Sequence, residues 1–316
     1  MRDSAITLVF QGPWHPAYAA NIAASRRAFP GARLVLSTWE DARGAVPAGL
    51  ADELVFSPDP GALPPYKFGR GQPANNVNRQ IASTRAGLAR VATPFAAKLR
   101  TDCALRSRAA LDAYQAWGEG RRLVVGSFYT LHPEGLEGFP YHVSDWFQFG
   151  RTEQLRDYWN VEPMTQDEAR WFELQPHAAG SHYFARRYRS RLAPEQYVAA
   201  AYARRRGYPV PCAIDDRYAG LAEAYARFLA RETVVQEPQL LGLSCPKYAR
   251  LASSHYQFFN CVSGADWRAL REGRFGAPGR RARAVALVRR FDAALPWMNK
   301  AGCMPLLGKC LSLYRD

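Results

Sequence analysis

The stretch Asn75–Asp102 reads N-N-V-N-R-Q-I-A-S-T-R-A-G-L-A-R-V-A-T-P-F-A-A-K-L-R-T-D and predicts a helix that leads into a strand. Apolar residues recur at helical spacing from Val77 to Leu88, which indicates one buried face. A second stripe with the same period contains Asn76, Arg79 or Gln80, Ser83 and Gly87. Because Asn, Gln and Ser are mediocre helix formers, this stripe favours a ligand-binding face over the alternative of a solvated surface.

The strand that follows, Phe95–Leu99, leads to a single carboxylate at Asp102. In an open α/β sheet, ligands bind beyond the carboxyl ends of the strands. A carboxylate there can hold a divalent cation against a diphosphate or accept hydrogen bonds from a ribose. Lys98 and Arg100 add positive charge nearby. The stretch therefore predicts a site for a phosphate-bearing ligand, with capping of the next helix by Asp102 as the alternative.

Strands and helices alternate through the first half of the chain. The predicted strands are 6–10, 33–37, 53–57, 95–99 and 123–128, and helical patterns lie between them. This order predicts an α/β fold with a mostly parallel sheet flanked by helices. After Gly150 helical segments dominate, with a late strand expected at Leu240–Leu243. We expect an α/β region over residues 1–150 and a mainly helical region over 151–316, which together form one compact unit.

The composition restricts the class of protein and its partners. The net charge of +14, carried mainly by Arg, favours a nucleotide, a nucleic acid or an acidic membrane surface. Nucleic acid is not expected, because the sequence lacks zinc-finger spacing, an RNP-type aromatic motif and a basic low-complexity tail. A signal peptide and an apolar run of about 18 residues are also missing, and the six cysteines are scattered. We therefore expect a cytoplasmic protein with free thiols.

The stretch from Arg280 is basic and amphipathic and reads R-R-A-R-A-V-A-L-V-R-R-F. Apolar residues opposite Arg on one helix, with Trp297 beyond, suit an interfacial helix on anionic lipid. One interpretation of this pattern is peripheral attachment to the cytoplasmic face of the inner membrane. The alternative is a packed helix with an Arg-rich solvent face.

Seven motifs follow one another over roughly residues 5–200. They are F-Q-G-P, F-P-G-A-R-L-V-L-S-T-W-E, S-P-D-P-G, N-V-N-R-Q-I-A-S-T-R-A-G-L, K-L-R-T-D, Y-H-V-S-D-W-F-Q-F-G and A-P-E-Q-Y. In this order they resemble the WavE-type family of lipopolysaccharide-synthesis proteins, which are regarded as glycosyltransferases. The resemblance implies a GT-A-like, Rossmann-like fold with a nucleotide-sugar-binding half and an acceptor-binding half.

The resemblance also implies an activity and a cofactor. Members are thought to move a sugar from a nucleotide-sugar donor to a lipid-linked acceptor, a lipopolysaccharide core or a related surface glycan. GT-A enzymes usually hold Mn²⁺ or Mg²⁺ with a D-x-D motif, whereas this sequence has R-T-D, so only Asp102 matches. Arg100 stands where the first carboxylate would be and can itself neutralise part of the diphosphate. His255 is a candidate for a late metal-binding histidine, with a structural histidine as the alternative.

Two acidic residues are candidates for catalysis. An inverting transfer needs a base for the acceptor hydroxyl and positive charge for the departing nucleoside diphosphate. Glu195 in A-P-E-Q-Y fits the base, since Pro194 suits the first turn of a helix; a favourable helix-dipole interaction is the alternative. Asp145, between Ser144 and Trp146, fits hydrogen bonding and stacking with a sugar. Its alternative is a turn aspartate near a core aromatic residue.

The nucleotide-binding candidates lie at strand ends and on the polar helix. They are Gln11, Gly12, Ser37, Thr38, Asn78, Arg79, Lys98, Arg100 and Asp102. Gly12 allows close approach of the backbone to a ligand. Asp59, in D-P-G, is interpreted as a turn former rather than a ligand.

Two other functions are compatible with the sequence. A sugar nucleotidyltransferase shares the α/β frame and the acidic strand end, but Q-G-P-W-H-P is a poor version of the Gly-rich phosphate loop such enzymes carry. A non-catalytic basic protein bound to a membrane or to nucleic acid is the third interpretation. The sequence does not specify the donor sugar, its nucleotide or the stereochemistry.

Overall fold

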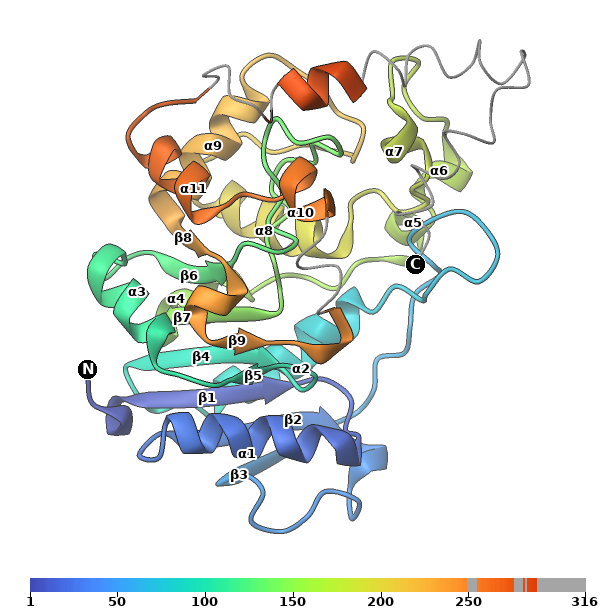
Figure 1. Ribbon diagram of the computed structural model, residues 1–316. Coiled ribbons are helices and arrows are strands. Elements are labelled where there is room, and N and C mark those ends of the chain that lie inside the picture. The colour runs from blue at the N-terminus through green and yellow to red at the C-terminus, as the bar shows by residue number, and fades with distance from the viewer. Residues whose placement is uncertain (249–254, 276–280, 282, 289–316) are drawn as a thin grey trace.

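A seven-stranded sheet forms the centre of the molecule (Figure 1). The computed structural model describes residues 1–248, 255–275, 281 and 283–288. The strands lie in the order β3-β2-β1-β4-β7-β6-β8. Their bounds are Ile6–Gln11 for β1, Arg33–Trp39 for β2, Glu53–Ser57 for β3, Phe95–Arg100 for β4, Leu123–Gly126 for β6, Phe147–Arg151 for β7 and Thr233–Gln236 for β8.

Most neighbouring strands of this sheet run parallel. β1 is parallel to β2 and β4, β2 to β3, and β6 to β8. β7 is the exception, because it runs antiparallel to both β4 and β6. The arrangement confirms the predicted α/β, GT-A-like fold with a mostly parallel sheet flanked by helices. The sequence patterns did not indicate β7 or β8.

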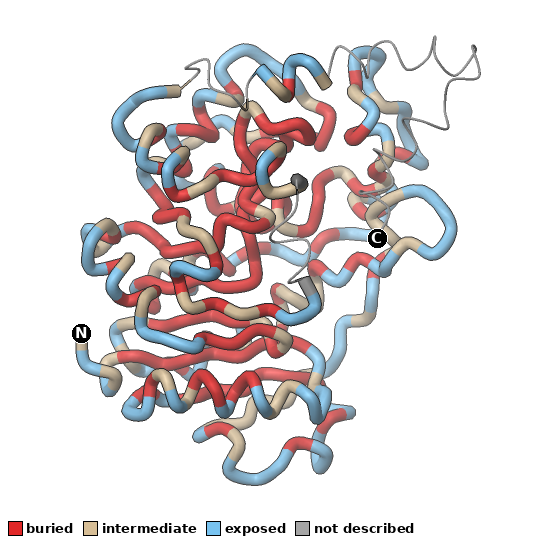
Figure 2. The backbone as a smooth tube through the Cα atoms, in the orientation of Figure 1, coloured by how far each residue is buried: buried red, intermediate tan, exposed pale blue. Residues whose placement is uncertain are grey.

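The strands other than the edge strand β3 are largely buried because helices and loops cover both faces of the sheet (Figure 2). All six residues of β1 and six of the seven residues of β2 are buried. Near-continuous apolar runs are typical of such central parallel strands. Lys98 in β4 departs from this rule, since its charged side chain is 0% exposed within the sheet.

The helices up to α4 lie next to the sheet. They are α1 (Ala19–Ala28), α2 (Val77–Ala89), α3 (Ala109–Trp117) and α4 (Thr152–Tyr158). In Figure 1, α1 runs across the front of the sheet, and α2 packs on β1 and β2. The packing is close at Gly87, where an added Cβ would lie 2.5 Å from Val9 Cγ1. Ser83 and Gly87 of the predicted polar stripe are therefore buried against the sheet instead of facing a ligand.

The second half of the chain is mainly helical. Its helices are α5 (Gln166–Ala169), α6 (Trp171–Leu174), α7 (Tyr183–Arg186), α8 (Pro194–Arg205), α9 (Leu221–Glu232), α10 (His255–Asn260) and α11 (Gly264–Arg271). They lie above the sheet in Figure 1. β7 passes through Gly150, and β8 pairs with β6, so residues on both sides of position 150 contribute strands to one sheet.

A small two-stranded sheet joins distant parts of the chain. β5 (Ala104–Leu105) pairs antiparallel with β9 (Leu243–Ser244). The late strand predicted at Leu240–Leu243 is wrong for its first residues, because Pro238–Leu241 forms the 3₁₀ helix η4. Gly242 ends η4 with a φ of 67°, and the chain is extended only from β9 onward.

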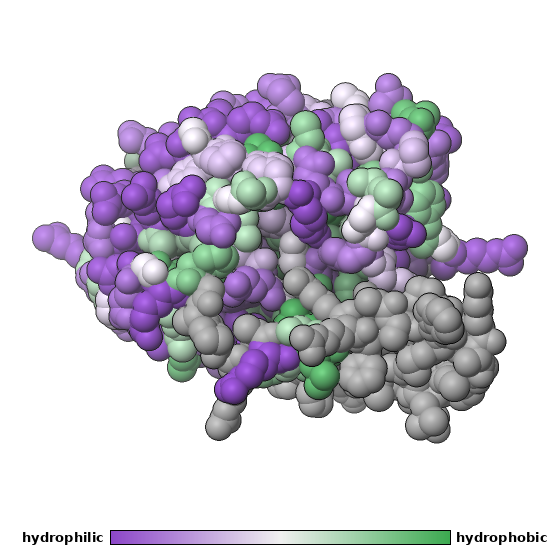
Figure 3. All heavy atoms as spheres, turned by 90° about the horizontal axis from the view of Figure 1, so that it is seen from above, coloured by the Kyte–Doolittle hydropathy of each residue, from purple (hydrophilic) through white to green (hydrophobic). Residues whose placement is uncertain are grey.

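Three observations on the described residues concern possible contact with a membrane. No helix among the described residues is long and apolar enough to cross a bilayer. On the face shown in Figure 3, hydrophilic side chains predominate over the described part, with hydrophobic ones scattered among them. Of the predicted amphipathic stretch from Arg280, residues 281 and 283–288 are described, whereas Trp297 lies outside the described residues. Within the described part, Arg281 pairs with Asp266 at 2.7 Å.

Candidate active site

The carboxyl ends of β1, β2 and β4 meet at one edge of the sheet because these strands are parallel. Gln11, the last residue of β1, pairs in register with Ser37 on one side and Arg100 on the other. Gly12 follows with a φ of 126°, and an added Cβ would lie 3.2 Å from Thr101 Oγ1. The structure thus brings together predicted site residues from three strands, at the position where open α/β sheets bind ligands.

Hydrogen bonds fix the polar side chains at the ends of β1 and β2. Ser83 Oγ donates to Gln11 Oε1 at 2.7 Å, and Ser37 Oγ donates to the backbone carbonyl of Ser83 at 2.7 Å. Thr38 Oγ1 is buried and has no hydrogen-bond partner within the part of the chain that the structure describes. Gln11 Oε1 and Ser37 Oγ therefore already have partners, whereas Thr38 retains unused hydrogen-bonding capacity.

Four charged residues form what we call the sheet-edge cluster: Lys98, Arg100, Asp102 and Asp145. Lys98 Nζ donates to the backbone carbonyl of Asp145 and lies 4.0 Å from Asp145 Oδ2. It also lies 4.6 Å from the centroid of the Trp159 ring, which favours a cation. Burial lowers the pKa of Lys98 to about 8, although the charge of Asp145 opposes the shift.

Arg100 and Asp102 make a direct ion pair within this cluster. Arg100 Nε donates to Asp102 Oδ1 at 3.0 Å, and Nη2 donates to Oδ2 at 2.6 Å. Burial would raise the pKa of Asp102, but the charge and hydrogen bonds of Arg100 outweigh it and lower the pKa. Two cations therefore balance two carboxylates, and Asp102 is held as a carboxylate.

Asp145 is the least satisfied residue of the sheet-edge cluster. It is 3% exposed, and neither of its carboxylate oxygens accepts a hydrogen bond from any described residue. The nearest cationic atoms that pair with it are Arg100 Nη1 at 3.6 Å and Lys98 Nζ at 4.0 Å. Because buried polar groups nearly always have close partners, such a carboxylate is typical of a group that binds a ligand.

A second set of charged residues, which we call the loop cluster, consists of Lys67, Glu137, His142 and Glu195. His142 Nδ1 lies 2.9 Å from the backbone carbonyl of Tyr129, and Nε2 lies 3.4 Å from Glu195 Oε2. Since a carbonyl can only accept, Nδ1 carries a hydrogen. The contact of Nε2 with Glu195 is then attractive only if a proton lies on one of the two groups. His142 is thus the direct neighbour of Glu195 in this cluster.

Lys67 and Glu137 complete the loop cluster. Burial lowers the pKa of Lys67, while the charges of Glu137 and Glu195 act to raise it. Lys67 Nζ lies 5.0 Å from the centroid of the Tyr188 ring. Glu137 Oε2 accepts a hydrogen bond from the Tyr256 hydroxyl at 3.1 Å. Glu195 itself lies in the first turn of α8, which begins at Pro194 as the sequence predicts.

One loop, residues 127–146 between β6 and β7, contributes to both clusters. It carries Glu137, His142 and Asp145. Tyr129 and Tyr141 within it have φ values of 64° and 62°, a conformation that costs about 1–3 kcal/mol in a non-glycine residue. The Tyr141 hydroxyl donates to the carbonyl of Pro209 at 2.8 Å, which ties the loop to the helical half. Strain held in this way is typical of functional loops.

The two clusters are neighbours. Arg100 N donates to the carbonyl of Trp146 at 3.1 Å, and the rings of Trp146 and Tyr129 lie 5.9 Å apart. Burial raises the pKa of Tyr158, and the charges of Asp145 and Glu195 both add to this shift. The two predicted catalytic carboxylates therefore lie within electrostatic reach of one buried hydroxyl.

The two predicted ligand contacts on α2 have protein partners instead. Asn78 Nδ2 donates to the carbonyl of Met164 at 2.9 Å, and Met164 N donates back to Asn78 Oδ1 at 2.7 Å. Arg79 pairs with Asp59 through hydrogen bonds of 2.8 and 2.5 Å. Asp59 Oδ1 also accepts from Gly61 N at 2.9 Å, so it forms the expected turn and an ion pair that the sequence did not reveal.

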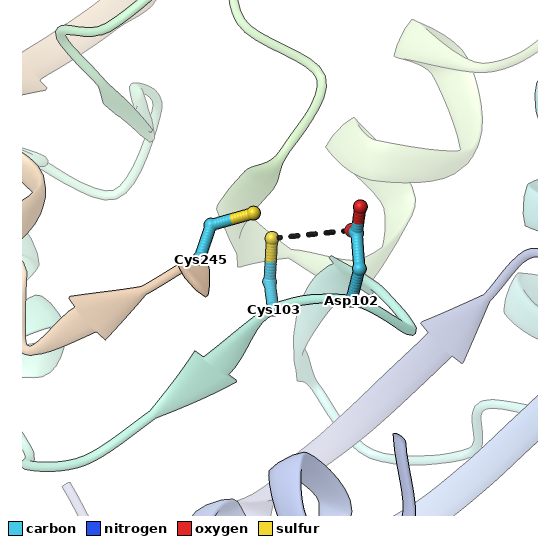
Figure 4. A group of neighbouring side chains, drawn as sticks. All are labelled: Asp102, Cys103 and Cys245. Atoms are coloured by element: carbon cyan, nitrogen blue, oxygen red, sulfur yellow. Dashed lines mark hydrogen bonds between the residues drawn. The ribbon is translucent and has the colours of Figure 1, made fainter. Parts of the chain in front are cut away.

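The two predicted metal ligands are not brought together by any described contact. His255 is the first residue of α10, and its side chain lies outside the described part of the structure. Asp102 instead lies beside Cys103 and Cys245 (Figure 4), and the three offer ligand atoms within 4.8 Å of one another. The spacing of these residues in the sequence did not indicate this group, because only the pairing of β5 with β9 brings Cys245 next to Cys103.

A pocket of about 420 Å³ opens next to this group. Its lining includes Arg106, Trp146, Gln239, Ser244 and Cys245. Trp146 belongs to the loop that carries Asp145, so the pocket adjoins the sheet-edge cluster. A volume of a few hundred Å³ suits a small-molecule ligand.

The fold and this edge define a GT-A-like α/β protein whose charged site lies at the carboxyl ends of parallel strands. The model of one family, described as WavE lipopolysaccharide synthesis, matches residues 6–294. The chain therefore belongs to the WavE lipopolysaccharide synthesis family. No curated protein matches the chain in sequence.

Several solved structures share part of the arrangement. A homologue of Mycobacterium tuberculosis rv0371c from mycobacterium sp. strain JC1 has 15% identity and a TM-score of 0.33, covering 55% of this chain and 82% of that one. The 4-diphosphocytidyl-2C-methyl-D-erythritol synthase of Anaerococcus prevotii DSM 20548 has 8% identity and a TM-score of 0.31, with 55% and 85% covered. An active-site mutant of LgtC has 13% identity and a TM-score of 0.32, with 53% and 64% covered. At these scores the likeness carries no argument about function.

Proposed function

We propose that the protein is a glycosyltransferase that moves a sugar from a nucleotide-sugar donor to a lipopolysaccharide core or a related surface-glycan acceptor. Membership of the WavE lipopolysaccharide synthesis family supports the process. The observation that carries the chemistry is the sheet-edge cluster, where Asp145 is buried without a hydrogen bond from any described residue. A carboxylate of this kind can accept hydrogen bonds from sugar hydroxyls, and the neighbouring cations can stabilise a departing diphosphate.

The two cations of the sheet-edge cluster have different roles in this proposal. Arg100 has a side chain 20% exposed and can contact the diphosphate while it holds Asp102. Lys98 is fully buried, so it positions Asp145 rather than touching the donor. Gln11, Gly12 and Thr38 would form the wall against the nucleoside.

Glu195 is the proposed base for the acceptor hydroxyl. As a base Glu195 is a carboxylate, and a hydrogen on His142 Nε2 would stabilise it through their 3.4 Å contact. Glu195 then takes the proton of the acceptor hydroxyl as that oxygen attacks the anomeric carbon. Inversion at that carbon is part of the proposal, and NMR of the product that shows retention would overturn it.

A hard metal ion does not fit the described residues around Asp102. Mn²⁺ and Mg²⁺ prefer oxygen ligands. Here one carboxylate, already paired with Arg100, is accompanied by two thiols. In the proposed mechanism Arg100 therefore neutralises the diphosphate, and Mn²⁺ or Mg²⁺ takes no part.

The first test is a thermal-shift screen of UDP-, GDP-, CMP- and dTDP-sugars with the purified protein. Ligand binding to the native state raises the apparent stability, so a hit names the donor class. Turnover with a core-oligosaccharide acceptor then compares wild type with Asp145→Asn, which we expect to lose about 100-fold in kcat/KM. The matched control is Asp112→Asn, an exposed aspartate on α3.

Three results would contradict the proposal. They are the absence of any donor hit, full activity of Asp145→Asn, and release of pyrophosphate from a nucleoside triphosphate and a sugar phosphate. The last would instead identify a nucleotidyltransferase. Attachment to the cytoplasmic face of the membrane is part of the same proposal, and flotation with anionic liposomes tests it.

A further inference from the structure

Cys103 and Cys245 face each other across the two-stranded sheet. β5 and β9 pair antiparallel with Ala104 opposite Ser244 and Leu105 opposite Leu243. Continuing this register by one residue places Cys103 opposite Cys245. Directly opposed residues of an antiparallel pair have their side chains on the same face, so the two thiols lie together.

Backbone contacts also hold the two segments together at the other end of the two-stranded sheet. Arg106 N donates to the carbonyl of Gly242 at 2.7 Å. Gly242 has a φ of 67°, and an added Cβ would clash with Ser107 Oγ and lie 3.0 Å from Ser107 N. Only glycine allows this contact, so the position of Cys245 follows from close backbone packing rather than from a flexible loop.

The distances in this group match those of a tetrahedral thiophilic metal site. All three ligand atoms lie within 4.8 Å of one another, and Cys103 Sγ lies 3.6 Å from Asp102 Oδ1. A zinc ion with sulfur at about 2.3 Å and oxygen at about 2.1 Å separates these two ligands by about 3.6 Å. Figure 4 shows the sulfur of Cys245 directed toward that of Cys103, with Asp102 on the other side.

We propose that Asp102, Cys103 and Cys245 form a binding site for a thiophilic divalent cation such as Zn²⁺. Three protein ligands leave a fourth coordination position, as in zinc sites that bind water or a substrate. Cys245 also lines the 420 Å³ pocket, so a water or a small molecule in this pocket can be the fourth ligand.

The charges around the group support a divalent ion. Two thiolates and one carboxylate with a divalent cation carry a net charge of minus one, and Arg100 neutralises it. Arg100 Nη2 donates to Asp102 Oδ2 at 2.6 Å and Nε donates to Oδ1 at 3.0 Å, so the metal would use the second lone pair of Oδ1. A hydrogen-bonded outer partner of this kind orients a metal-binding carboxylate. Arg100, which stands where the first acid of a D-x-D motif would be, then orients one of the metal ligands.

The metal site shares Asp102 with the proposed donor site but does not depend on turnover. Its test is a titration of the full-length protein, reduced and freed of metal with a chelator, with Co²⁺ and then with competing Zn²⁺. We expect one equivalent of Co²⁺ to bind, with a thiolate-to-cobalt charge-transfer band and the d–d bands of tetrahedral coordination, and Zn²⁺ to displace it. Mn²⁺ should compete poorly.

Three variants locate the site. Cys103→Ser and Cys245→Ser should each lose the charge-transfer intensity and weaken binding at least about tenfold, since even outer-shell changes cost about 10–100-fold. Cys212→Ser, at an exposed free cysteine, should leave the spectrum unchanged. Circular dichroism shows whether each variant is folded.

A wild-type spectrum without a thiolate band, tighter binding of Mn²⁺ than of Zn²⁺, or an unchanged spectrum in Cys103→Ser and Cys245→Ser would each overturn the site. The wild-type spectrum decides even if a variant does not fold. Because metal binding is measured without donor or acceptor, this site can fail while the glycosyltransferase proposal stands, and the reverse also holds.

Discussion

The sheet-edge cluster and the loop cluster both contain buried charges, but they are built in different ways. The first takes Lys98 and Arg100 from one strand and balances them against two carboxylates. The second takes residues from separate loops and from the start of α8, where His142 Nε2 lies 3.4 Å from Glu195 Oε2. The difference suggests a fixed electrostatic frame for the donor and a proton-accepting group for the acceptor.

The largest expected effect separates the two clusters by activity. Glu195→Gln should lower kcat about 10²- to 10⁴-fold, because it removes a general base, and should leave donor binding intact. The control is Glu223→Gln, an exposed acid that also lies in the first turn of its helix, α9. Equal losses in both variants would mean that Glu195 acts only through the helix dipole.

Removal of the buried lysine should show how strongly the sheet-edge cluster depends on charge balance. Lys98→Met should lower the free energy of unfolding by about 3–5 kcal/mol, because Asp145 loses a close cation and its carbonyl loses a donor. The double variant Lys98→Met/Asp145→Asn should recover part of this loss, as measured by urea denaturation. A double variant no more stable than Lys98→Met would show that charge is not the cause.

The pH dependence of stability gives a further test of Lys98. Burial lowers its pKa to about 8 in the folded protein, from an ordinary value of 10.5. Between these values the unfolded chain binds a proton that the folded chain does not, so the contribution of Lys98 to stability rises with pH. Below pH 8 both states hold the proton and the contribution is constant. Denaturation of wild type and Lys98→Met between about pH 7.5 and 10 should show this slope in wild type alone.

The packing under the sheet edge should be sensitive to one methyl group. Gly87→Ala should destabilise the protein by about 1–3 kcal/mol, because the new Cβ would lie 2.5 Å from Val9 Cγ1. The better helix propensity of Ala offsets only part of this cost. Gly180→Ala, where an added Cβ meets nothing within 4 Å, is the control in the same thermal melts. Equal melting temperatures for both variants would show that α2 shifts away without cost.

The smallest effect is expected on α2, outside both clusters. Arg79→Ala should change stability by only about 0.2–1 kcal/mol, since its partner Asp59 is similarly exposed at the surface. Donor affinity in the thermal-shift assay should also stay close to wild type. A loss of donor binding would restore Arg79 as a ligand contact and extend the donor site beyond the sheet-edge cluster.

Strand ends could be predicted from the sequence because alternating elements imply a parallel sheet, and its carboxyl ends converge. Gln11, Ser37 and Arg100 meet for that reason. The polar residues of α2 could not be assigned from the sequence alone, since a side chain that binds a loop backbone, such as Asn78, looks the same in sequence as one that binds a ligand.

The loop cluster and the pair formed by Cys103 and Cys245 could not be predicted from the sequence, for a different reason. Glu195 was recognisable from its position at a helix start, but His142 and Lys67 reach it only through the tertiary fold. Cys103 and Cys245 meet through strands of two residues each, which are too short to leave a periodic pattern.

The direction of β7 has a consequence for how proteins with this fold can vary. Because β7 runs against β4 and β6, the chain leaves the sheet after β6 and returns to β7 at the same edge. The loop of residues 127–146 therefore begins and ends on adjacent strands, where a doubling of loop length costs only about 0.6 kcal/mol of closure entropy. We expect that most of this loop can be exchanged between related proteins without loss of the fold. A chimera that takes residues 127–143 from a relative and keeps Asp145 should change its acceptor and keep its donor, and loss of donor binding in a folded chimera would refute this prediction.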